Sequence, residues 1–109
     1  MLNTVFDVVW HLSPEDSPDI VGLLAGKVVL VEVKTTVKDH FYIRRDADTI
    51  SQYERLLSLA KRYTVYYAVK FMSRGWRFYY LPAEGFSKTR LTIPDGMTWE
   101  DLNTRVSLL

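Results

Sequence analysis

Two apolar runs that flank a two-residue linker constrain the fold of this chain more than any other feature of its sequence. The runs are Asp19 to Leu24 and Lys27 to Thr36, both rich in β-branched residues, and Ala25-Gly26 lies between them. Such runs favour strands, and a short linker with a glycine is typical of a tight antiparallel turn. The segment therefore predicts a β-hairpin, in which a linker of this length pairs Asp19 with Glu32.

The charged residues of this hairpin are unusual because the surrounding strand is apolar on both faces. Glu32 and Lys34 interrupt a run of valine and leucine, and charges in such a strand need a partner or a function. Strand periodicity places Glu32 and Lys34 on one face. Two carboxylates that meet across a hairpin repel each other, so a divalent cation is the expected counter-charge between Asp19 and Glu32. A structural Glu-Lys pair at a sheet edge is the alternative.

This arrangement suits the hydrolysis of a phosphodiester. Asp19, Glu32 and the backbone carbonyl of Val33 are hard oxygen ligands for Mg²⁺ or Mn²⁺, which polarises a phosphate and lowers the pKa of a bound water. Lys34 adds a positive charge that can orient or help to deprotonate this water and can stabilise the negative charge that develops on phosphorus. The predicted catalytic residues are therefore Asp19, Glu32 and Lys34.

The composition narrows the class of protein and of metal site. With 109 residues, 48% of them hydrophobic, we expect a single domain over residues 1–109 with its own core. The absence of cysteine and the presence of only two histidines exclude disulfides, thiolate zinc sites and histidine-rich metal sites. No run approaches the roughly 18 apolar residues of a membrane span, and no signal peptide is recognisable. We therefore expect a cytoplasmic protein that does not bind membranes.

The charges are unevenly distributed, although the formal net charge is only +1. Residues 1–20 contain four acidic residues and no Lys or Arg, whereas residues 55–77 contain six basic residues and no acid. This distribution suits an acidic metal pocket beside a phosphate-binding surface, although charge runs are more often simply solvated faces.

The rest of the chain alternates between strand-like and helical segments. The period-two and 3, 4 spacings of the apolar residues predict further strands and two helices. The expected strands are Val5–Trp10, Thr64–Met72, Trp76–Leu81 and Arg90–Ile93, and the expected helices are Asp48–Tyr63, capped by Thr49 or Asp48, and Thr98 to about Leu108. Residues 36–46 are expected to form a loop or an irregular strand extension. The order β-β-β-α-β-β-β-α predicts an α+β fold, a central mixed β-sheet with helices packed on it.

Eight aromatic residues gather between positions 66 and 86 of the chain. They are Tyr66, Tyr67, Phe71, Trp76, Phe78, Tyr79, Tyr80 and Phe86. Core packing is the default, but strands alternate faces, so some of these side chains are expected to point outward. We expect the outward set to form a dimer interface rather than a platform for base stacking. Tyr42 can stack on DNA or cover the end of the sheet.

The hairpin motif and the segments after it resemble a known family. Pro18-Asp19 followed by Glu32-Val33-Lys34 at the end of an apolar strand is the signature of the PD-(D/E)XK nucleases. The segment Val33 to Ile43, followed by Ala68 to Phe71 and by Gly75 to Phe78, is similar in sequence and order to the archaeal Holliday junction resolvases. The resemblance covers roughly Phe6 to the C-terminus.

The resemblance implies a restriction-endonuclease-like α/β core and the activity of a crossover junction endodeoxyribonuclease, a hydrolase of DNA recombination and repair. It implies a homodimer that binds four-way DNA junctions in the nucleoid and makes paired, Mg²⁺-dependent cuts without a small-molecule cofactor. Among single residues, it implies metal ligation by Asp19 and Glu32, a catalytic role for Lys34 and a supporting role for Gln52. The residues implied in junction binding are Ser13 or Ser17, in the loop before the aspartate, and the basic segment with Lys38, His40, Arg44 and Arg45.

The beginning of the chain departs from the pattern of this family. The resolvases start with a helix that carries a further catalytic glutamate, whereas only Met1 to Thr4 precede the first expected strand. Two alternatives to a resolvase therefore stay open. One is a module of the same fold that binds nucleic acid with weak or no cleavage, and the other is a related nuclease that acts on a flap, a nick or a restriction site.

Overall fold

The computed structural model describes residues 8–11, 18–24 and 26–107. Its strands are β1 (Val8–His11), β2 (Ile20–Leu24), β3 (Lys27–Thr36), β4 (His40–Tyr42), β5 (Thr64–Phe71), β6 (Gly75–Tyr80) and β7 (Arg90–Thr92), and its helices are α1 (Ala47–Ala60) and α2 (Trp99–Ser107). None of the helices in these ranges is long and apolar enough to span a membrane. The order of elements agrees with the expected one except for β4, which is an additional strand.

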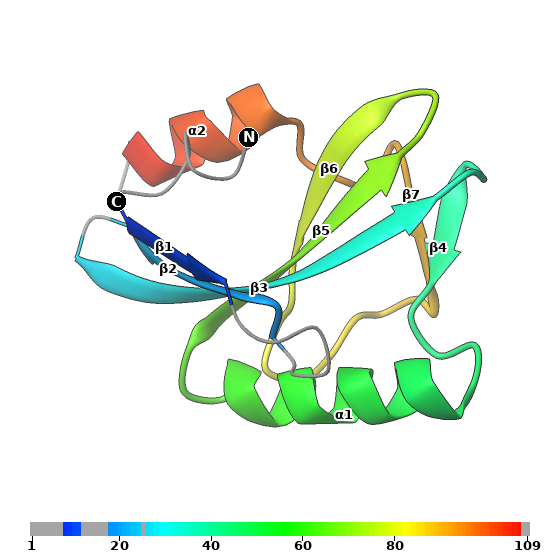
Figure 1. Ribbon diagram of the computed structural model, residues 1–109, viewed down its shortest axis with the longest axis horizontal. Coiled ribbons are helices and arrows are strands. Elements are labelled where there is room, and N and C mark those ends of the chain that lie inside the picture. The colour runs from blue at the N-terminus through cyan, green and yellow to red at the C-terminus, as the bar shows by residue number, and fades with distance from the viewer. Residues whose placement is uncertain (1–7, 12–17, 25, 108–109) are drawn as a thin grey trace.

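A five-stranded sheet forms the centre of the molecule, in the order β1-β2-β3-β5-β6 (Figure 1). β3 pairs with β5 in parallel, and the other neighbours in this sheet are antiparallel. A parallel pair needs a crossover connection, which β4 and α1 provide between β3 and β5. The predicted α+β fold with a mixed central sheet is confirmed.

The hairpin of β2 and β3 has the register that its short linker predicts. Leu24 pairs with Lys27 next to the turn, and Ile20 pairs with Val31 at the far end of the ladder. Gly26 has a φ of 79°, in the left-handed region of backbone conformation. Glycine adopts this conformation without the steric strain that a Cβ atom causes in other residues. Because the register is fixed by the turn, every residue of β3 has a defined face.

Both faces of the sheet are covered, one by α1 and the other by α2 (Figure 1). Leu30 of β3 belongs to the core cluster that also contains Leu56 of α1, whereas Val29 and Val31 belong to a second cluster with Leu102 of α2. This alternation follows from the two-residue period of a strand. It places the even-numbered residues of β3, including positions 32 and 34, on the α1 side.

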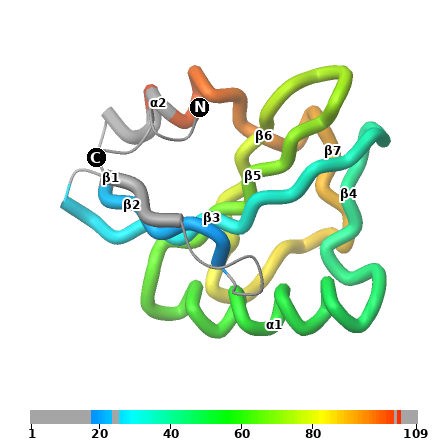
Figure 2. Tube along the Cα trace, viewed as in Figure 1, coloured from blue at the N-terminus to red at the C-terminus, as the bar shows by residue number. Residues whose placement is uncertain are grey.

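A second sheet, of β4 and β7, lies beyond the end of β3 (Figure 2). Residues 36–46 were expected to be a loop or an irregular strand extension, and three of them form β4 instead. β4 and β7 pair in the antiparallel sense, with Phe41 opposite Leu91. Leu91 is buried in the core cluster on the α1 side, and Phe41 packs against that cluster. These two side chains attach the small sheet to the body of the molecule.

The boundaries of the helices differ from the expected ones in a way that their caps explain. Asp46 is the N-cap of α1, in place of the expected Asp48 or Thr49, because its carboxylate accepts a hydrogen bond of 2.9 Å from the Thr49 backbone N–H. Thr49 completes the capping box by accepting from the Asp46 backbone N–H. Thr98 and Asp101 form a capping box at the start of α2, with both reciprocal hydrogen bonds at 3.1 Å.

The aromatic residues between positions 66 and 86 mostly belong to the core. Five of the eight are less than 10% exposed, namely Tyr66, Tyr67, Phe71, Phe78 and Tyr79. Trp76 and Phe86 are half-buried, and Tyr80 is the one exposed member of the group. The expectation that some of these side chains point outward is thus confirmed for Tyr80. The dimer interface expected from the outward set stays a prediction.

Candidate active site

Glu32 lies on the central strand β3, on the face that α1 covers. It is 1% exposed, and it is the one charged residue that is buried within the described parts of the chain. The parallel pairing of β3 with β5 places Tyr67 beside it. Burial raises the pKa of the Tyr67 hydroxyl, and the charge of Glu32 raises this pKa further. Glu32 is thus a buried carboxylate on an otherwise apolar strand, as the sequence predicted.

Lys34 and Gln52 complete a polar cluster around this carboxylate. The Lys34 Nζ lies 3.2 Å from Glu32 Oε2, and the Lys34 side chain remains 19% exposed. The same ammonium group donates a hydrogen bond to Oε1 of Gln52, which lies in the second turn of α1. The structure therefore brings together Glu32, Lys34 and Gln52, which a strand and a helix contribute.

Asp19 reaches the same strand from the other arm of the hairpin. β2 begins at Ile20, so Asp19 lies one residue before the ladder rather than in it. Its half-buried carboxylate accepts a hydrogen bond of 2.8 Å at Oδ2 from the backbone N–H of Val33. The expected cross-strand pair with Glu32 is thus replaced by a contact with the next residue of β3, which still anchors Asp19 at this position of the strand.

The donor set of these residues fits a hard divalent cation. Within the described residues no three His, Cys, Asp or Glu side chains come together as a metal site. The two carboxylates that the hairpin could offer to a cation are Asp19 and Glu32. Mg²⁺ commonly uses only one or two carboxylates and completes its octahedron with waters and substrate phosphates. The Lys34 ammonium beside Glu32 shows that the buried carboxylate already accommodates a positive charge.

The basic residues expected to contact DNA lie along β4 and its flanking turns. Lys38, Arg44 and Arg45 are exposed, and His40 is half-buried with its Nδ1 2.8 Å from Asp39 Oδ1. These residues follow β3 directly in the chain, so they lie beyond the strand end that carries Lys34 (Figure 2). Ser13 and Ser17 lie outside the described residues.

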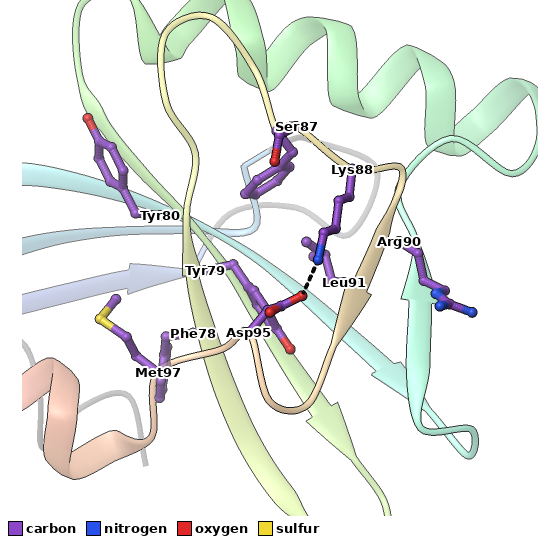
Figure 3. A pocket seen from close by; sticks show the side chains of 10 residues that line it. Phe78, Tyr79, Tyr80, Ser87, Lys88, Arg90, Leu91, Asp95 and Met97 are labelled. Carbon is purple, nitrogen blue, oxygen red and sulfur yellow. Dashed lines mark hydrogen bonds and ion pairs between the residues drawn. The ribbon is translucent and has the colours of Figure 1, made fainter.

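A hollow of about 350 Å³ on the surface lies apart from these catalytic candidates. Figure 3 shows Tyr79, Lys88, Arg90 and Asp95 among its lining residues, with Lys88 directed toward Asp95. None of the predicted catalytic residues lines it, so its size alone does not make it the active site. No function was predicted for Arg90 or Lys88, because neither residue belongs to a recognisable sequence motif.

Comparison with known proteins decides which family this fold and these residues represent. The family model of the archaeal Holliday junction resolvase (Hjc) matches residues 11–102. The chain belongs to the Hjc family. The matched range includes Asp19, Glu32, Lys34 and Gln52. The nucleases of this family generally need a divalent metal ion.

A solved structure supports the same fold. The chain is similar to the Hjc Holliday junction resolvase of the archaeal hyperthermophile Archaeoglobus fulgidus, with a TM-score of 0.61 and 20% sequence identity. The alignment covers 94% of this chain and 85% of the other. No curated protein matches this chain in sequence. The Hjc fold is therefore shown here by the structure and by the family model together.

Proposed function

We propose that this protein is a crossover junction endodeoxyribonuclease that binds four-way DNA junctions as a homodimer and resolves them by paired, metal-dependent cuts. Asp19, Glu32 and Lys34 are its catalytic residues. The observation that carries the proposal is the buried Glu32 carboxylate with Lys34 at 3.2 Å, in a chain of the Hjc family. A purely structural ion pair has no need of a position in the middle of an apolar sheet.

Asp19, Glu32 and the backbone carbonyl of Val33 are the ligands for the metal. Mg²⁺, or Mn²⁺ in its place, supplies a Lewis acid for a phosphoryl oxygen and increases the acidity of water when bound. Asp19 is held for this role by the Val33 backbone N–H, and Glu32 is held by its burial in β3. Such fixed carboxylates lose little entropy when they bind the cation.

Lys34 provides the positive charge beside the reacting phosphate. Its ammonium has three hydrogen-bond donors, of which Glu32 and Gln52 each engage one. The remaining donor can orient a water for attack or stabilise the negative charge that develops on the phosphate. Gln52 is a positioning residue, because it acts on the phosphate only through Lys34.

Junction binding rests on the charges around this site and on symmetry. Lys38, His40, Arg44 and Arg45 contact DNA phosphates next to the cleaved one, together with Ser13 or Ser17. A two-fold homodimer presents two identical sites to a junction with two-fold symmetry, which accounts for paired cuts. We infer that the enzyme works in the cytoplasm on nucleoid DNA.

A labelled four-way junction and a linear duplex of the same arm sequence test this proposal. The proposal predicts that the wild-type chain cuts the junction with Mg²⁺, leaves the linear duplex intact and has no activity in EDTA. Tight binding to the junction without any cut would favour a binding module of the same fold. Equal cleavage of the linear duplex would favour a nuclease with another substrate.

A further inference from the structure

The small β4–β7 sheet has one face in the core and one face in solvent. Phe41 and Leu91 point into the core, so strand alternation directs their neighbours outward. Two cross-strand pairs form the outward face, namely His40 with Thr92 and Tyr42 with Arg90. We call these four residues the outer face of the β4–β7 sheet.

Three hollows in the surface meet at this outer face. All three are lined by Arg90, which is exposed. One of them adds Lys88 and Asp95 (Figure 3), another adds Tyr42, and the third adds His40 and Arg74. A hollowed surface with both polar and apolar lining residues therefore adjoins Arg90.

The acids next to this surface are already paired. Asp95 accepts hydrogen bonds from Thr92 Oγ1 at 2.8 Å and from Lys88 Nζ at 3.3 Å, and Asp39 pairs with His40. Within the described residues, Arg74 and Arg90 form no ion pair with an acid. Two guanidinium groups that present planar donors to solvent are suited to bind phosphate oxygens.

The composition of the outer face suits the DNA backbone better than a base edge. It offers the Arg90 guanidinium, the Thr92 hydroxyl and the aromatic ring of Tyr42. The rings of Tyr42 and His40 make an edge-on contact, with a distance of 5.1 Å between their centroids. Arginine, threonine and tyrosine are among the side chains that contact phosphates and sugars in protein–DNA complexes. No groove-reading helix or long ribbon is present here that would reach base edges.

We infer that the outer face of the β4–β7 sheet, with Arg90 at its centre, binds the sugar-phosphate backbone of a junction arm that lies beside the cleavage site. The chain itself connects the two places, because β3 carries Lys34 and continues through a short turn into β4. This inference rests on the proposed function and extends it. It adds Arg90 and Arg74 to the DNA contacts that the basic segment after β3 makes.

The salt dependence of junction binding tests this inference. Binding is measured in EDTA, where no cleavage is expected, for wild type, Arg90→Gln and Arg74→Gln. Each variant should bind about 3- to 10-fold more weakly at about 0.1 M salt, and the slope of log K against log salt should become shallower by about 0.9 for each lost phosphate contact. Thermal unfolding of the variants verifies that they are folded.

Two further variants separate a specific contact from a general effect of charge. Arg62→Gln removes an exposed arginine beyond the last turn of α1, at the end of this helix opposite to β4, and should leave affinity and slope as in wild type (Figure 1). Asp95→Asn removes a negative charge and the ion pair with Lys88, but its amide oxygen can still accept the hydrogen bond from Thr92. This variant should therefore bind the junction more tightly than wild type. Damage to the fold would weaken junction binding, so it cannot explain a variant that binds more tightly.

The possible failures are distinguishable. If wild type binds the junction but Arg90→Gln has the affinity and slope of wild type and of Arg62→Gln, the inference is wrong and the proposed function stands. If wild type does not bind the junction at all, both are wrong. If Arg62→Gln weakens binding as much as Arg90→Gln, the contact is a diffuse charge effect and the inference fails.

Discussion

Glu32 occupies a position that is costly for a charged residue, because its side chain is buried. A buried carboxylate loses its hydration, and a well-packed apolar side chain at such a position is often as stable or more stable. Lys34 and Gln52 lie on the same side of β3 and compensate only part of this cost, since Lys34 remains partly exposed. The proposed catalytic role of Glu32 accounts for a charge that is kept at this cost.

The substitution Glu32→Gln separates the chemical role of this residue from a structural one. It preserves shape and hydrogen bonding but removes the charge, so Mg²⁺-dependent cleavage should fall by at least about 100-fold. Thermal unfolding in EDTA should show a stability within about 1 kcal/mol of wild type, because an uncharged amide is cheaper to bury. A large loss of stability with retained cleavage would identify Glu32 as a structural partner of Lys34 instead.

Gln52 offers a second test at this scale, because it touches Lys34 and not the substrate. Gln52→Ala should lower the cleavage rate by about 10- to 100-fold, as expected when a residue that orients a catalytic group is lost. Gln52→Glu keeps an acceptor for the Lys34 ammonium and should retain more activity than the alanine variant. Ser51→Ala, at an exposed neighbouring position of α1, is the control and should cleave like wild type.

Some contacts among the residues of the site could be predicted from the sequence, and others could not. The shared face of Glu32 and Lys34 follows from strand periodicity alone, and the structure confirms it through their contact. Asp19 was expected to lie opposite Glu32, but it contacts the next residue of β3 instead. The β2–β3 ladder ends at Ile20, and the Asp19 carboxylate accepts a hydrogen bond from the Val33 backbone N–H. The contact between Lys34 and Gln52 depends on how α1 packs on the sheet, which no local pattern specifies.

At the scale of elements, α1 determines where Gln52 lies, and Asp46 determines where α1 begins. The Asp46 carboxylate accepts from the backbone N–H of Thr49, and this hydrogen bond, with a smaller contribution from the Thr49 side chain, lowers the pKa of Asp46 below its ordinary value of 3.8. A carboxyl group whose pKa is lowered in the folded state stabilises the fold above its unfolded pKa. This stabilisation is lost as the pH falls through the folded-state pKa.

The cap therefore predicts a pH-dependent effect of Asp46→Ala. The variant should unfold at a lower temperature than wild type at pH 7, and the difference should shrink as the pH falls below 3.8, since the protonated wild-type carboxyl no longer accepts the hydrogen bond as well. Thermal unfolding between pH 7 and pH 2 measures this difference. Asp46→Asn, which caps without titrating, is the control. A difference that is the same at every pH would contradict this account of the cap.

Elements with a long apolar period could be predicted from the sequence, whereas the three-residue strand β4 could not. β3, β5 and α1 were predicted because each has enough residues for its period to be recognised. β4 has three residues, HFY, and pairs with β7, which is 50 residues further along the chain and equally short. The burial of Leu91 and the packing of Phe41 contribute to the stability of this pair, and both depend on the tertiary structure.

At the scale of the whole molecule, the central sheet leaves its catalytic candidates near one end. α1 and α2 cover its faces, and the β4–β7 sheet lies next to the strand end that carries Lys34 (Figure 1). The site and the proposed arm contact thus belong to one side of the molecule. A second copy, related by a two-fold axis, would present a second such side to the opposite strand of a junction.

Paired cutting is the proposed property that depends on the active site, the proposed dimer and the junction at the same time. A supercoiled plasmid with an extruded cruciform contains a four-way junction, and two symmetric cuts convert it to a linear product, whereas a single cut gives an open circle. The experiment compares wild type with Lys34→Ala, each with Mg²⁺ and with EDTA. All products are separated by gel electrophoresis.

The predicted result is a linear plasmid from wild type with Mg²⁺, and an uncut plasmid from wild type in EDTA and from Lys34→Ala under both conditions. Binding of Lys34→Ala to the cruciform verifies that the variant is folded and still reaches its substrate. Open circles alone from wild type would contradict paired cutting, and cleavage by Lys34→Ala at the wild-type rate would contradict the assignment of the active site.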